Sequence, residues 1–155
     1  MTIQQQQPAE IFYAVMCDQG WRTQQAHVGV IIGPESTQLQ IRRDEQNHWY
    51  CNGERIKGVD GVVDIDLSIS PATNTLPIRR LALEIGESRA VDAAWVRFPE
   101  LTLERLDQRY TRLDARRYRF ESGGGTFTAE IEVDDNGVVA RYSDLWERVA
   151  PPLGK

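Results

Sequence analysis

Two aspartates and two arginines have the residue types and spacing that could carry out chemistry in this chain. Asp64 and Asp66 stand two residues apart in the alternating run VDIDLSIS, so a strand would place both carboxylates on one face. Paired carboxylates could bind a metal or act as general acid and base. No third carboxylate or histidine follows at a suitable spacing. We therefore favour a solvated or arginine-paired face, and we predict no catalytic residue, no metal and no cofactor.

Arg79 and Arg80 follow the loop that ends this run. Either guanidinium could bind an anionic or sugar-bearing head group through its planar fork of donors. The alternative, which we favour for Arg79, is that it pairs with Asp64 or Asp66 and holds the loop across the sheet. Because side chains alternate along a strand, Arg80 would then lie on the opposite face.

Uncharged side chains could complete a ligand site. Asn74 could contact a ligand, although such residues more often satisfy their own loop backbone. Large aromatic residues could line a lipid cavity or stack on a sugar, although most aromatics on strand faces simply form the core. The residues for which we predict a ligand-binding role are Asp66, Asn74, Arg79, Arg80, Trp95, Tyr110 and Tyr118.

The elements that must position these residues are predicted to be strands. The run from Asp60 to Leu83, DGVVDIDLSISPATNTLPIRRLAL, favours a strand, a loop and a second strand, in which Arg79, Leu81, Leu83 and Ile85 share a face. Residues 100–116 fit a helical stripe, but we assign a strand because strands surround them. Other strands are expected at residues 11–17 (buried on both faces), 26–32, 37–43, 48–52, 89–98, 127–133 and 138–142, with a short turn of helix at 143–148.

Short strands separated by turns predict a mainly β fold, a single-domain antiparallel curved sheet or barrel with little helix. We expect one domain over residues 1–155, with frayed tails at 1–9 and 150–155.

Net charge and hydropathy reduce the number of function classes that fit this chain. The net charge of −5 gives no electrostatic support for binding nucleic acid, and no apolar run approaches the roughly 20 residues that span a bilayer. The first ten residues lack a signal-peptide pattern, so we expect a cytoplasmic protein in which Cys17 and Cys51 are reduced. An exposed edge strand would allow a homodimer, which nothing in the sequence specifies.

Several motifs resemble one bacterial family. They are the central run with its block TNTLPIRRL, then FPELTLERLDQRYTRL, YRFES and FTAEIEVDDNGVVARY. Together they are similar to the putative glycolipid-binding family, over most of the chain from about Trp21 to Arg148, with Val62 in place of an expected cysteine. The resemblance implies a sheet-rich half-barrel related in shape to the envelope lipoprotein carriers, which hold lipid. It also supports the strand assigned to residues 100–116.

We therefore favour a non-enzymatic protein that binds a glycolipid or similar amphipathic small molecule in an apolar cavity, with Arg79 or Arg80 and Asn74 at a polar rim. Two alternatives stay open. One is an enzyme acting on such a ligand, with Asp64 or Asp66 as acid and base. The other is a structural or partner-binding module whose interior is filled by its own side chains.

Overall fold

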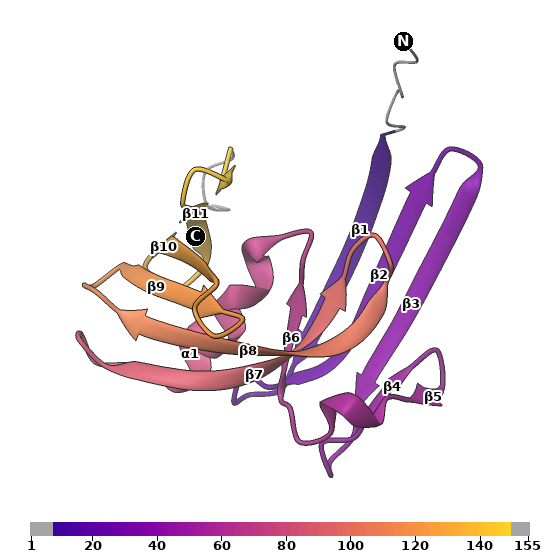
Figure 1. Ribbon diagram of the computed structural model, residues 1–155, viewed down its shortest axis with the longest axis horizontal. Coiled ribbons are helices and arrows are strands. Elements are labelled where there is room, and N and C mark those ends of the chain that lie inside the picture. Colours follow the sequence, from indigo (N-terminus) through magenta and orange to yellow (C-terminus); the bar gives the residue numbers. More distant parts are fainter. Residues whose placement is uncertain (1–7, 150–155) are drawn as a thin grey trace.

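Two curved sheets and one short α-helix make up the computed structural model, which describes residues 8–149 (Figure 1). The first sheet has the strand order β1-β2-β3-β4-β5, and the second has the order β12-β11-β10-β9-β8-β7-β6. Neighbouring strands in the described residues run antiparallel, except β6 and β7, which are parallel. The mainly β fold predicted from the sequence is confirmed, and the second sheet curls into a half-barrel.

The strands of the first sheet are β1 (Ala9–Cys17), β2 (Thr23–Ile32), β3 (Glu35–Arg43), β4 (Trp49–Cys51) and β5 (Glu54–Arg55). Those of the second sheet are β6 (Asp64–Leu67), β7 (Ser88–Arg97), β8 (Thr102–Arg112), β9 (Arg117–Ser122), β10 (Phe127–Val133), β11 (Val139–Tyr142) and β12 (Trp146–Glu147). The helical segments are η1 (Lys57–Val59), η2 (Pro71–Asn74) and α1 (Thr75–Leu81). The strand assigned to the ambiguous residues 100–116 is confirmed as β8.

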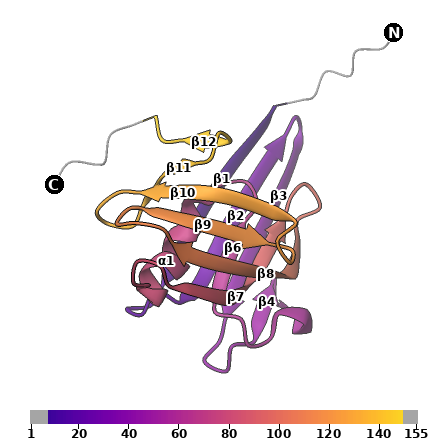
Figure 2. The same cartoon turned by 60° about the vertical axis from the view of Figure 1, so that its left-hand side comes forward.

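The strands of the second sheet run across those of the first, and β6 links the two (Figure 2). The Thr23 amide of β2 donates to the Val63 carbonyl at 3.0 Å, and the Ile65 amide donates to the Thr23 hydroxyl at 3.1 Å. Ile65 packs in a first core between the sheets, whereas Ile78 of α1 packs in a second core on β8–β11. The helix therefore lies against the curled sheet, with β6 beside it.

β1 is an edge strand, and the expectation that it is buried on both faces is wrong. Ile11, Val15 and Cys17 pack against the first core, whereas Phe12 and Met16 are exposed. β1 pairs with β2 alone, so its apolar run has only one covered face. Hydrophobic composition predicted the strand, but it could not show that β1 lies at an edge.

The second strand expected after the central loop is also wrong, because these residues form α1. The Ser70 hydroxyl accepts a hydrogen bond from the Ala72 amide at 3.2 Å, and Pro71 starts η2. Pro77 lies in the first turn of α1, where a missing N–H costs little. Ala82 ends the helix in the left-handed region, with φ of 46°. The 7 residues of α1 are too few for periodicity to separate a helix from a strand.

Arg80, rather than Arg79, pairs with a β6 carboxylate. Nε and Nη2 of Arg80 donate to Oδ1 and Oδ2 of Asp64 at 3.2 and 2.5 Å, which joins the last turn of α1 to β6. Asp64 is buried, and that burial raises its pKa while Arg80 opposes the rise. Arg79 instead lies over the Trp21 ring, 4.2 Å from the centroid. The expected pairing of Arg79 fails because consecutive side chains on a helix do not alternate between two faces.

The segment after β11 is a strand rather than the expected turn of helix. Ser143 has a left-handed φ of 46°, and the chain then returns so that Trp146 of β12 pairs with Tyr142. A left-handed residue favours a reversal of the chain over the start of a helix.

The tails expected at residues 1–9 and 150–155 lie outside the described residues, apart from Pro8 and Ala9. Ala9 already belongs to β1 and pairs with Ile32, so the tail predicted at residues 1–9 extends too far along the chain. In the part of the chain that the structure describes, no helix is long and apolar enough to cross a membrane.

Replacing Arg80 should destabilise the fold more than replacing its exposed neighbour Arg79. Arg80→Met leaves the Asp64 carboxylate buried without a counter-charge, and we expect the free energy of unfolding to fall by about 3 kcal/mol. Arg79→Met removes a cation–π contact with Trp21 and a hydrogen bond to the Asn136 carbonyl, each exposed and worth about 1 kcal/mol or less. Urea unfolding at neutral pH measures both losses. Equal losses would show that the ion pair does not hold α1 against β6.

Candidate functional site

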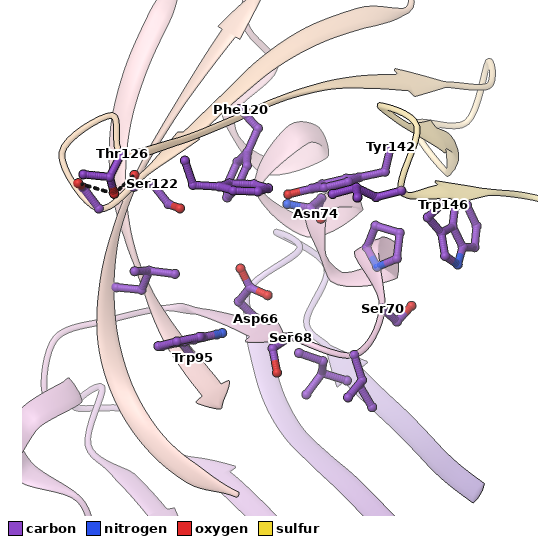
Figure 3. A pocket seen from close by; sticks show the side chains of 17 residues that line it. Asp66, Ser68, Ser70, Asn74, Trp95, Phe120, Ser122, Thr126, Tyr142 and Trp146 are labelled. Carbon is purple, nitrogen blue, oxygen red and sulfur yellow. Dashed lines mark hydrogen bonds between the residues drawn. The ribbon is translucent and has the colours of Figure 1, made fainter. Parts of the chain in front are cut away.

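A cavity of 540 Å³ lies between β6, η2 and strands β7–β12 (Figure 3). Ligand pockets in proteins have volumes of about 300–1,000 Å³. Most of the lining is apolar, and its aromatic members are Trp95 of β7, Phe120 of β9, Phe127 of β10, Tyr142 of β11 and Trp146 of β12. The interior at this point is therefore not filled by the protein's own side chains.

A second depression of 540 Å³ lies on the first sheet, beside Met16, His27 and Arg42. None of the buried polar residues lines it. The cavity of Figure 3 differs in this respect, because buried Asn74 and Ser122 face it. Convergent polar groups in an apolar pocket are the usual mark of a binding site, so we take this cavity as the candidate site.

Asp66 provides the one carboxylate among the described residues that line the cavity. It follows Asp64 by two residues on β6, which places both side chains on one face, as predicted. Nε2 of Gln108, a buried residue of β8, donates to Asp66 Oδ2 at 2.5 Å, whereas no described residue hydrogen-bonds to Oδ1. Burial raises the pKa of Asp66 to about 6, and the Gln108 hydrogen bond opposes that rise. Figure 3 shows the carboxylate pointing into the space between Trp95 and Phe120.

A second polar group comes from the end of η2. Asn74 Nδ2 donates to the Tyr110 hydroxyl at 2.7 Å, and both side chains are buried. Burial, and after it the charge of Asp66, raises the pKa of Tyr110 well above its usual value. The same two causes raise the pKa of Tyr142. Both tyrosines therefore stay neutral, and with Asp66, Asn74 and Gln108 they form what we call the polar cluster.

The structure brings three of the seven predicted site residues to the cavity lining, namely Asp66, Asn74 and Trp95. Tyr110 lies directly behind Asn74. Tyr118 packs in the second core, where the Arg112 guanidinium lies 5.7 Å from its ring centroid. That these residues bind a ligand stays a prediction.

The two arginines predicted for a polar rim lie outside the cavity lining. Arg79 covers Trp21 and donates to the Asn136 carbonyl, whereas Arg80 is held by Asp64. Asn74, the third residue of the expected rim, is buried. Of the three residues expected at the rim, Asn74 alone therefore lines the cavity.

Sequence analysis missed Gln108 and the aromatic residues Phe120, Tyr142 and Trp146. Gln108 had a usable signal, because a polar residue between Leu106 and Tyr110 on one strand face needs a buried partner. The three aromatics had no such signal. They come together only through the order of β9, β11 and β12 in the curled sheet.

Few charged side chains line the cavity. The described part of the lining includes no lysine, arginine or histidine, and Asp66 is its one carboxylate. Within residues 8–149, no group of three or more His, Cys, Asp or Glu side chains could hold a metal ion. An anionic group in this cavity would therefore meet a carboxylate without a counter-charge.

These features define a β half-barrel protein with an internal, mostly apolar cavity. Residues 1–148 match the family described as "Putative glycolipid-binding", and the chain belongs to this family. The resemblance stated from the sequence motifs is thereby confirmed. The chain is also similar to a DUF1089 family protein from Pseudomonas aeruginosa, known from a crystal structure, with 34% identity, a TM-score of 0.87, and coverage of 96% of this chain and 82% of that chain. No match was found among curated proteins.

Replacing Asp66 should stabilise the protein at high pH only. The unfolded chain loses the Asp66 proton near the ordinary pKa of 3.8, whereas the folded protein keeps it up to about pH 6. The free energy of unfolding therefore falls by up to about 3 kcal/mol as the pH rises from about 4 to above 6. Asp66→Asn keeps an acceptor for Gln108 and removes the buried charge. We expect it to raise the free energy of unfolding at about pH 8 and to leave it nearly unchanged at about pH 4.

The matched control for this prediction is Asp64→Asn. It leaves Arg80 without its anion and should destabilise the protein at about pH 8. Urea unfolding of both variants across the pH range makes the comparison. An Asp66→Asn variant with the same pH dependence as the wild type would contradict the assignment of a raised pKa to Asp66.

Proposed function

We propose that this protein binds an amphipathic small molecule in the cavity of Figure 3 and is not an enzyme. The observation that carries the proposal is the cavity itself, 540 Å³ of space with aromatic walls and with Asp66, Asn74 and Tyr142 of the polar cluster in its lining. Such a combination suits a molecule with one apolar and one polar part. The description of the family, "Putative glycolipid-binding", names a ligand of this kind.

A structural module with a filled interior is supported less well. Trp95 and Phe127, which would have to fill such an interior, line an open space instead. A partly buried carboxylate with a raised pKa also costs stability, and a purely structural interior gains nothing from keeping it. Charges of this kind are found more often at functional sites.

An enzyme acting on the same ligand is also supported less well. The pKa of about 6 for Asp66 would suit a general acid or base. Hydrolysis of a glycosidic bond commonly uses two carboxyl groups that face the bond, and the cavity lining contains one. Asp64, the other candidate carboxylate, already accepts two hydrogen bonds from Arg80. These features favour binding over turnover.

Blocking the cavity should abolish binding. Leu106 lies on β8 and lines the cavity, so Leu106→Trp places a large ring in the ligand's space. Arg109 is exposed on the same strand, and Arg109→Trp puts an identical side chain outside. Isothermal titration calorimetry with n-octyl β-glucoside, below its micelle concentration, should give saturable binding to wild type and Arg109→Trp. For Leu106→Trp we expect affinity to fall by about tenfold or more.

Two outcomes would contradict the proposal. Undiminished binding by a folded Leu106→Trp variant would place the ligand elsewhere on the protein. No saturable heat with any octyl amphiphile, whether neutral, anionic or cationic, would remove the support for a binding role.

A further inference from the structure

Buried and exposed residues both line the cavity, and they present different groups to it. The exposed fractions of the buried polar lining residues Asn74 and Ser122 are 5% and 8%. At the outer end the exposed fractions are larger, 39% for Phe127 and 72% for Leu145. Both of these outer residues line the cavity and are apolar. The buried lining therefore offers hydrogen-bonding groups, and large apolar side chains lie at the mouth beside the exposed Ser68 and Thr126.

The closed end of the cavity, where Asp66 and Asn74 lie, presents hydrogen-bonding atoms that have no partner among the described residues. No described residue hydrogen-bonds to Asp66 Oδ1 or Asn74 Oδ1, although the other polar atom of each side chain is held, by Gln108 and Tyr110. At pH 7, above the pKa of about 6 for Asp66, the two oxygens are acceptors only. A partner for them must therefore donate.

Two hydroxyl groups beside these acceptors are open as well. Ser122 is buried and Tyr142 is partly buried; both line the cavity, and neither hydroxyl has a partner among the described residues. Ser68, by contrast, already donates to the Val96 carbonyl at 2.8 Å. Open hydroxyls can donate or accept, so the closed end as a whole suits a group that carries several hydroxyls.

Charge separates this ligand class from the other amphiphiles. A phosphate, sulfate or carboxylate head group would sit beside Asp66, and no described lysine, arginine or histidine lines the cavity to offset the repulsion. A cationic head group would satisfy Asp66, but it could not donate to Asp66 and Asn74 while also using the Ser122 and Tyr142 hydroxyls as both donors and acceptors. The rings of Trp95 and Phe120 would cover the apolar faces of a sugar.

We propose that the ligand enters head first, with an uncharged, hydroxyl-rich head group against Asp66 and Asn74, and with its alkyl chain against Phe127 and Leu145 at the mouth. This inference rests on the proposed binding function and adds the ligand class and its direction. Most of the specificity then comes from the head group, because the chain lies where it is partly exposed to water.

The test compares n-octyl β-glucoside with its two halves, methyl β-glucoside and 1-octanol, and with octyl phosphate and octyltrimethylammonium, by calorimetry and ligand-observed NMR. We expect methyl β-glucoside to bind weakly and to displace octyl glucoside, whereas octanol should not. Octyl phosphate should bind about tenfold or more weaker than octyl glucoside. Asp66→Asn, which should fold at least as well as wild type, should weaken octyl glucoside binding about tenfold. Leu145→Ser, the matched change at the mouth, should weaken it only about threefold.

The binding data distinguish failure of the head-first orientation from failure of the ligand class and from failure of the proposed function. If octanol binds as tightly as octyl glucoside, or if Asp66→Asn changes nothing, the cavity binds amphiphiles but not head first. If octyltrimethylammonium binds most tightly, the head group is a cation and the ligand class is wrong. If none of the five probes binds, the proposed function itself fails.

Discussion

The ion pair between Arg80 and Asp64 is the interaction on which the rest of the site depends. It joins the end of α1 to β6, the strand that links the two sheets through Thr23. Asp64 is buried, so its charge would be costly without the bidentate guanidinium. Once β6 and α1 are held together, Asp66 follows two residues along the strand, and Asn74 lies just before the helix. Both side chains then face the same cavity.

The two carboxylates on one face of β6 thus have different roles. Asp64 has a complete set of partners and serves the fold. Asp66 has one partner, Gln108, and leaves an oxygen open towards the cavity. Its raised pKa is the physical sign of this incomplete solvation, because the protein stabilises the charged form less well than water does. Under the proposed function, a ligand would complete the hydrogen bonds of this group and offset its cost in stability.

Local patterns predicted the strands well and the helix poorly. Alternation identified β6 and β10 because each has one apolar and one polar face over several residues, whereas β8 was assigned from its neighbouring strands and the family resemblance. The residues of α1 were misread because a seven-residue helix spans only two turns, and its leucines and arginines also fit a two-residue repeat. That error exchanged the roles of Arg79 and Arg80. Asp66, Asn74 and Trp95 were found from residue type, whereas Tyr142 and Trp146 reach the cavity only through the long-range order of the curled sheet, which no local pattern encodes.

Native mass spectrometry of the protein purified from its own host, followed by solvent extraction and identification of the released molecules, tests the central claim most directly. The account predicts one bound molecule per chain, uncharged, with a hydroxyl-rich head group and an alkyl chain, retained by wild type and lost from Leu106→Trp. A protein that carries no ligand and shows no thermal shift with a panel of neutral lipids would contradict it, as would a bound lipid with an anionic head group.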